Sequence, residues 1–156
     1  MNDDEKIPGM FSKNFLMNLR IAPNRLISDL QKDFNNAFPF LKLEFFRNRN
    51  QQIPVFTFQQ ILPYNNRIGE GQAAITDGDI EVNPDMRVKE LEKIFQDQFS
   101  LAVQVFRRSG NLWLETTMTD NWTLRQQNEH GREISTDNKE NDFGKDDDEL
   151  SRDADH

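Results

Sequence analysis

The sequence predicts a mixed α+β fold, and three observations support that class. A helix-like segment followed by a strand-like segment occurs twice, at residues 30–47 and 91–108. A short run of alternating apolar residues precedes each copy, at residues 15–21 and 79–82. A further strand-like run, NLWLETT, follows the second copy. Alternating apolar residues are typical of strands, whereas an apolar residue at every third or fourth position is typical of an amphipathic helix.

Two amphipathic helices are expected, one over residues 26–38 and one over residues 88–99. Each carries a single apolar stripe, formed by Leu26, Leu30, Phe34 and Phe38 in the first helix and by Val88, Leu91, Phe95 and Phe99 in the second. The motifs APN and NPD precede these helices. Asn24 and Asp85 are therefore the expected N-caps, because short polar side chains accept hydrogen bonds from the first free N–H groups of a helix.

A strand is expected directly after each helix, at residues 41–47 and 101–108. The two copies keep the same spacing of apolar residues, so that Phe46 in the first corresponds to Phe106 in the second. Two consecutive β-α-β units in a chain of this length predict a four-stranded antiparallel sheet with both helices on one face. This is the ferredoxin-like arrangement.

A hairpin is expected to extend this sheet. Ser109 and Gly110 form its predicted turn, and NLWLETT forms a fifth strand beside the strand at residues 101–108. The following segment, TDNWTLRQQN, predicts a short helix that carries Trp122 and Leu124, with Asp120 as its N-cap.

Charge divides the chain into a body and a tail. The net charge of the 156 residues is −8, and residues 130–156 hold ten acidic and four basic residues. Few apolar residues accompany them, so burial cannot offset the entropy of ordering this segment. We therefore predict a flexible N-terminus at residues 1–13, an α+β domain at residues 14–129 with an inserted connection at residues 48–77, and a disordered acidic tail at residues 130–156.

Catalysis is not predicted. The chain has no cysteine, and its two histidines, His130 and His156, fall in the expected tail. This composition argues against a cysteine nucleophile, a rigid histidine-based triad and a cysteine or histidine metal site. The motifs GEG and DGD are expected to form turns, since they lack the rest of a phosphate-binding or calcium-binding loop. No cofactor and no bound metal are expected, and without a long apolar segment we predict a cytoplasmic protein.

An open sheet face is the predicted binding surface. If Leu41, Leu43 and Phe45 point toward the helices, and Leu101, Val103 and Val105 do so in the second copy, alternation directs the intervening side chains to the other face. The same rule, with Leu112 and Leu114 pointing inward, directs Trp113 outward. The predicted partner-binding residues are Phe46, Gln104, Phe106, Arg107 and Trp113.

The sequence leaves open which of three kinds of occupant covers this face. Residues 48–77 or the helix near Trp122 would cover it within the molecule. Another protein or a second copy of the chain would make the domain a non-catalytic interaction module, and this is the predicted function. Single-stranded nucleic acid is the alternative, because aromatic side chains and the arginines at the strand ends, Arg47, Arg107 and Arg108, would suit bases and phosphates. The anionic tail and the lack of a basic-Gly-aromatic motif oppose it.

One segment resembles a known type of domain. Residues 103–128, VQVFRRSGNLWLETTMTDNWTLRQQN, match the string QVFRxSGxxWLETTxTDxWTLxxQN that closes a family of small uncharacterised bacterial domains. The resemblance extends more loosely back to the first repeat. It implies a small intracellular domain, and it implies no activity, cofactor or site residue.

Overall fold

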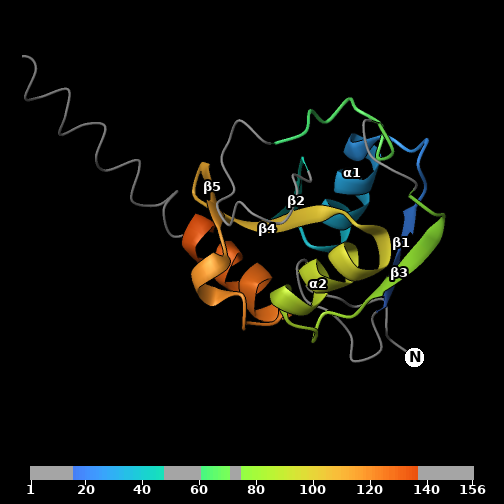
Figure 1. The fold of residues 1–156 in the computed structure, drawn as a ribbon. Helices are drawn as coiled ribbons and strands as arrows, with labels where there is room; N and C mark the ends of the chain where they lie inside the picture. Colours follow the sequence, from blue (N-terminus) through green and yellow to red (C-terminus); the bar gives the residue numbers. More distant parts are fainter. Residues whose placement is uncertain (1–15, 48–60, 71–74, 137–156) are drawn as a thin grey trace, which may run out of the picture.

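The computed structural model describes residues 16–47, 61–70 and 75–136, which form five strands, three α-helices and a short 3₁₀ helix (Figure 1). In chain order these elements are β1 (Met17–Ile21), α1 (Ile27–Ala37), β2 (Leu41–Phe46), β3 (Gly78–Val82), α2 (Val88–Phe99), β4 (Ala102–Ser109), β5 (Leu112–Glu115), η2 (Thr117–Thr119) and a helix at residues 124–136. The α+β class is confirmed. The predicted flexible N-terminus, most of the inserted connection and residues 137–156 lie outside the described residues.

The strands form two antiparallel sheets. One contains β1 and β3, and the other has the strand order β2-β4-β5. The ferredoxin-like arrangement is therefore not confirmed, since it requires β1 to β4 in a single sheet. The physical reason lies in β4, which gives one edge to β2 and, from Phe106 to Ser109, its other edge to β5. No edge of β4 remains at that end for β1, which pairs only with β3 among the described strands.

The pairing of β2 with β4 joins the two copies of the repeat. Its register places Leu41 opposite Arg107, Leu43 opposite Val105 and Phe46 opposite Ala102. Leu41, Leu43 and Phe45 are buried, as are Val103 and Val105 across the strand pair. The predicted inward positions of these two strands are thus confirmed.

A single core lies between the two sheets and the helices. Leu19 and Ile21 of β1 and Ile80 and Val82 of β3 reach it from one side, and the inward residues of β2 and β4 reach it from the other. The buried residues of α1 and α2, among them Leu30, Phe34, Leu91 and Phe95, belong to the same core. Burial of one large apolar side chain contributes about 1.5–3 kcal/mol, so these residues hold both helices in place.

The first turn of α1 is held by a second segment of backbone rather than by a side chain. Residues 23–27 and 64–68 form similar turns that lie antiparallel, with a bridge between Leu26 and Arg67. Four backbone hydrogen bonds join them, from Ile27 N to Asn66 O (2.9 Å), Ser28 N to Tyr64 O (2.8 Å), Ile68 N to Arg25 O (2.8 Å) and Gly69 N to Pro23 O (2.9 Å). Gly69 permits this approach, because a Cβ there would lie 2.8 Å from Pro23 Cβ.

The same clamp occurs in the second half of the chain. Residues 84–88 lie against residues 120–124, with a bridge between Arg87 and Thr123. The bonds are Val88 N to Trp122 O (3.0 Å), Lys89 N to Asp120 O (3.0 Å), Leu124 N to Met86 O (2.9 Å) and Arg125 N to Pro84 O (2.8 Å). The repeat predicted from the sequence therefore extends to how the helices begin.

These clamps explain why the predicted N-caps are wrong. The N-cap residues are Leu26 and Arg87, and neither makes a side-chain capping hydrogen bond. Backbone carbonyls of the facing turn accept from the free N–H groups of the first helical turn, so a capping side chain is not required. Asp85 instead forms an ion pair with Arg125, with 2.9 Å between Oδ1 and Nε.

The helix at residues 124–136 is longer than expected and includes the start of the predicted tail. The prediction of disorder is wrong for residues 130–136, which are helical. Asp120 is not the cap. Thr123 and Gln126 form a reciprocal capping box, in which Thr123 N donates to Gln126 Oε1 (2.8 Å) and Gln126 N donates to Thr123 Oγ1 (3.1 Å).

This helix packs closely on β4 and the hairpin through one face. Gly131 lies against the strand, since a Cβ there would be 3.0 Å from side-chain atoms of Phe40 and Arg107. Ser135 Oγ accepts a hydrogen bond from Gly110 N at 3.2 Å. Leu124 is fully buried in the core. Figure 1 shows the helix beside β5, at the end of the molecule opposite to β1 and β3.

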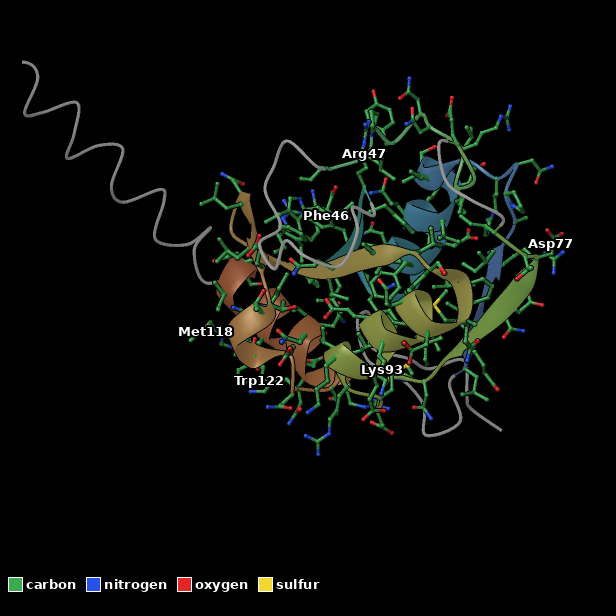
Figure 2. All side chains as sticks on the ribbon, in the orientation of Figure 1. Phe46, Arg47, Asp77, Lys93, Met118 and Trp122 are labelled. Carbon is green, nitrogen blue, oxygen red and sulfur yellow. The ribbon has the colours of Figure 1, made fainter. Side chains whose placement is uncertain are left out.

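We expect Leu124→Ala to lower the free energy of unfolding by about 2–5 kcal/mol, because it leaves a cavity where the last helix meets the core. Met118→Ala is the matched control, since Met118 is 96% exposed (Figure 2), and it should change the value by less than about 0.5 kcal/mol. Urea denaturation of both variants measures the difference. Equal stabilities would contradict the packing of this helix.

Candidate functional site

The two predicted phenylalanines lie on the expected sheet face but are not accessible. On β2, Lys42 and Phe46 alternate with the core-facing residues and so point to the other face of the sheet. Phe106 of β4 lies opposite Lys42 and points to the same face. Phe46 is only 2% exposed and Phe106 only 4%. The prediction that both rings are accessible to a partner is therefore wrong, because both are buried in the single chain.

Gln104 and Arg107 are also engaged within the molecule. Gln104 is half-buried, and its Oε1 is buried without a hydrogen-bond partner among the described residues. Arg107 lies on the opposite, helix-covered face, where Nη1 donates to Gln127 Oε1 at 2.8 Å. Its predicted place at the margin of the open face is wrong, since it alternates with Phe106 and points the other way.

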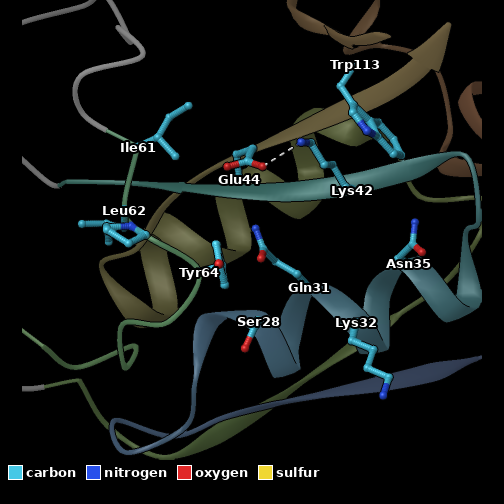
Figure 3. A pocket seen from close by; sticks show the side chains of 11 residues that line it. Ser28, Gln31, Lys32, Asn35, Lys42, Glu44, Ile61, Leu62, Tyr64 and Trp113 are labelled. Atoms are coloured by element: carbon cyan, nitrogen blue, oxygen red, sulfur yellow. Dashed lines mark ion pairs between the residues drawn. The ribbon is translucent and has the colours of Figure 1, made fainter. Parts of the chain in front are cut away.

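Trp113 is half-buried, as are Gln104 and Arg107, and its ring lies beside Lys42. Lys42 lies between two aromatic rings, with its Nζ 5.1 Å from the centroid of Trp113 and 5.8 Å from that of Phe106. The same ammonium is 3.0 Å from Glu44 Oε1 (Figure 3). This arrangement fixes Lys42 by a cation–π contact and an ion pair.

A groove of about 570 Å³ begins at Trp113 and runs between β2 and α1 (Figure 3). Its walls come from three parts of the chain, namely α1, β2 and residues 61–64, with Trp113 at one end. The described lining residues are Ser28, Gln31, Lys32, Asn35, Lys42, Glu44, Ile61, Leu62, Pro63, Tyr64 and Trp113. The volume falls within the range of about 300–1,000 Å³ that ligand sites occupy.

The floor of the groove is the outer edge of β2. Gln31 Nε2 donates to the Leu43 carbonyl at 2.7 Å, and Asn35 Nδ2 donates to the Leu41 carbonyl at 2.9 Å. Both amides rise from α1 toward the strand in Figure 3. Farther along, Leu62 N donates to the Phe45 carbonyl at 2.7 Å. The edge from Leu41 to Leu43 is thus held by side chains of a helix rather than by a neighbouring strand.

The corresponding edge in the second copy is closed. Glu92 of α2 occupies the position that Gln31 holds in the repeat, and its Oε2 accepts from Val105 N at 2.9 Å. Thr116 Oγ1 donates to the Val105 carbonyl at 2.8 Å, and Thr116 is buried. Only the first copy therefore combines an accessible strand edge with a groove among the described residues.

Burial raises the pKa of the Glu92 carboxyl from its ordinary value of 4.5 to about 7. This pKa is the net result of three causes: burial raises it most, the hydrogen bond from Val105 N lowers it, and the negative charge of Asp120 raises it by less. A carboxylate with poor solvation and one nearby acid prefers its protonated form. Glu92 therefore titrates close to neutral pH.

The conspicuous string at residues 103–128 is explained by packing. Gln127 is fully buried and its Nε2 donates to the carbonyl and to the hydroxyl of Thr119, both at 2.8 Å. Asn128 is also fully buried, and its Oδ1 accepts from Phe40 N at 2.9 Å. These buried polar side chains hold the last helix against the preceding turn and the start of β2, so this part of the string has a structural role.

The part of the chain that the structure describes holds no group of three His, Cys, Asp or Glu side chains placed to bind a metal ion. His130, expected in the tail, lies in the last helix and packs edge-on against Trp122, with 5.4 Å between the ring centroids. None of the helices in the described ranges is both long and apolar enough to cross a bilayer. The cytoplasmic location stays a prediction.

No family model, curated protein or solved structure matches this chain. The resemblance at residues 103–128 therefore stays a prediction, and the candidate site rests on its own geometry.

We expect Glu92→Gln to remove a pH dependence of stability between about pH 4.5 and pH 7. Below this window the carboxyl is protonated in both states. Within it the unfolded chain releases the proton while the folded chain keeps it, so the wild type loses stability as the pH rises. The variant keeps an oxygen for Val105 N and should be more stable by up to about 3 kcal/mol at pH 8.

Urea denaturation at pH 4.5 and pH 8 measures this effect. Glu90→Gln is the control, because Glu90 lies on the exposed side of the same helix. If Glu92→Gln lost as much stability between pH 4.5 and pH 8 as the wild type does, another titrating group would be the cause of the pH dependence.

Proposed function

We propose that this chain is a non-catalytic interaction module that binds an extended segment of a protein partner in the groove beside β2. The observation that carries the proposal is the edge of β2, where the side-chain amides of Asn35 and Gln31 are the groups among the described residues that hold the Leu41 and Leu43 carbonyls. This edge opens into the groove of about 570 Å³. An exposed strand edge is a recurrent binding site for extended peptides.

The backbone of the bound segment takes the place of the two amides. Its N–H groups donate to the same carbonyls, and Gln31 and Asn35 turn toward solvent or toward the segment. Exchanging one hydrogen bond for another changes the free energy little, because a net hydrogen bond contributes about 0.5–1.5 kcal/mol. The affinity therefore comes from the side chains that the segment buries in the groove.

Alternate side chains of the segment meet two different walls. One set faces Trp113, Ile61 and the Lys42–Glu44 pair, and the other faces the polar surface of α1. Tyr64, which is 69% exposed, also lines the groove. The walls favour a segment with apolar or aromatic residues on one side and polar residues on the other.

Single-stranded nucleic acid is the weaker candidate. Two of the three strand-end arginines are already engaged, because Arg107 donates to Gln127 and Arg108 Nε donates to the Gly110 carbonyl at 2.9 Å. Lys42 in the groove is paired with Glu44. Phosphate binding needs free cations, and Arg107, Arg108 and Lys42 are each engaged within the molecule.

The test is selection of binding peptides from a random library displayed on phage, followed by titration of a selected peptide. We expect Ser28→Arg, which fills the groove, to weaken binding at least about tenfold. Glu90→Arg places the same side chain on the exposed side of α2 and should leave binding unchanged. In an NMR titration, the backbone amide groups whose chemical shifts change on peptide binding should lie in β2 and α1.

Selected peptides that bind equally well to wild type and Ser28→Arg would overturn the groove as the site. Tight binding of an oligothymidylate that weakens steeply with salt would instead favour the nucleic-acid function.

A further inference from the structure

The other end of the three-stranded sheet has a second free edge. The strand order β2-β4-β5 makes β5 an outer strand, and no strand in the described ranges pairs with its outer side. Leu112, Leu114 and Glu115 are exposed and Trp113 is partly exposed. β5 therefore exposes most of its side chains, and its outer edge has no strand partner in the described ranges.

The hydrogen-bond pattern of the sheet decides which backbone groups point outward. Arg108 N donates to the Phe40 carbonyl at 2.9 Å, on the side of β4 away from β5. Arg108 lies opposite Trp113, so the two form a non-hydrogen-bonded pair of the ladder. The backbone groups of Arg108 point away from β5, and those of Trp113 point away from β4. The N–H and C=O of Trp113 thus face outward, ready to pair with another strand.

The exposed leucines are unusual for such an edge. The sequence predicts that Leu112 and Leu114 point into the core, and this is wrong, because they are 65% and 42% exposed. They lie opposite Ser109 and Arg107, at the end of β4 where the core no longer reaches. Outer strands are commonly protected by lysine, proline or a bulge, and β5 has only Glu115.

We propose that two copies of this chain associate through their β5 strands, antiparallel and around a twofold axis at Trp113. In this register Trp113 lies opposite Trp113 of the other copy, and each Leu112 lies opposite Leu114. The outward N–H and C=O groups of both Trp113 residues meet as a hydrogen-bonded pair. The two leucine pairs meet on the sheet face that carries Arg107, beyond the part that the last helix covers, where both leucines are exposed in the single copy.

A second copy suits this edge better than an unrelated chain because the edge is complementary to itself. A twofold interface requires the same surface on both subunits. An antiparallel pair centred on an outward-pointing residue meets that requirement in both its hydrogen bonds and its apolar side chains. The register at Trp113 also keeps all of residues 112–114 paired with their counterparts.

The association joins two three-stranded sheets into one of six strands. It places the two Trp113 side chains next to each other on the groove face, so that each copy extends the wall of the other's groove. A contact of four residues per strand is small compared with about 800 Å² per partner in a standard interface. We therefore expect a reversible dimer whose population depends on protein concentration.

Sedimentation velocity of the full chain over about a hundredfold range of concentration tests the association. The wild type should shift from monomer toward dimer. The variant with Leu112→Lys and Leu114→Lys should remain monomeric over the same range, because it opposes like charges in both leucine pairs. Leu16→Lys is the control, since Leu16 is 53% exposed and lies outside β5, and it should behave as the wild type.

Disulfide formation tests the register, because the chain has no natural cysteine. Cα atoms of directly opposed residues in such a pair lie about 4.5 Å apart, within the range that a disulfide spans. We expect oxidation to link an equal mixture of the Leu112→Cys and Leu114→Cys proteins, and to link neither protein when it is alone. Linkage within either single variant would overturn the register.

A wild type that stays monomeric at all concentrations would overturn the proposal. The two proposed sites are separable. Ser28→Arg should weaken peptide binding and leave the dimer intact, whereas the double lysine variant should dissociate the dimer and still bind the peptide. If the wild type bound none of the displayed peptides, the proposed groove function would fail and the dimer through β5 would be unaffected.

Discussion

The antiparallel pairing of β2 with β4 is the contact on which the rest of the structure depends. It is the joint between the two repeats, and its hydrogen-bond phase decides which groups of each strand point away from the other. On β2 this phase turns the Leu41 and Leu43 carbonyls toward α1 and the groove. On β4 it turns the backbone of Val105 toward Glu92 and Thr116. The open edge and the closed edge are thus two results of one pairing.

The two halves use the same device to begin their helices. Antiparallel turns supply carbonyls to the first free N–H groups of α1, α2 and the helix at residues 124–136. The clamp ties segments far apart in the sequence, and it makes the last helix part of the domain. Sequence differences between the halves then matter at few places. An amide at Gln31 corresponds to a carboxylate at Glu92, and the second of these titrates near neutral pH.

The predictions from sequence succeeded where one local period sufficed. Alternation located β2 and β4 and their core-facing residues, and the spacing of Leu30 and Phe34 located the stripe of α1. They failed where a contact with a segment distant in the sequence determines the local structure. Asn24 has the chemistry of a cap, yet the turn at residues 64–68 takes that role. The groove was missed because Gln31 and Asn35 look like ordinary solvent-facing residues, and only their spacing of four hinted that they share one side of the helix.

The sequence by itself determined the α+β class, the internal repeat and the apolar faces of the helices and central strands, because each depends on residues within a few positions of one another. Only the tertiary structure decided that the strands form two sheets, that Phe46 and Phe106 are covered, and that Trp113 borders a groove. Strand neighbours, hydrogen-bond phase and solvent access depend on contacts between distant segments. A local pattern of apolar and polar residues does not specify which of several possible edges will meet.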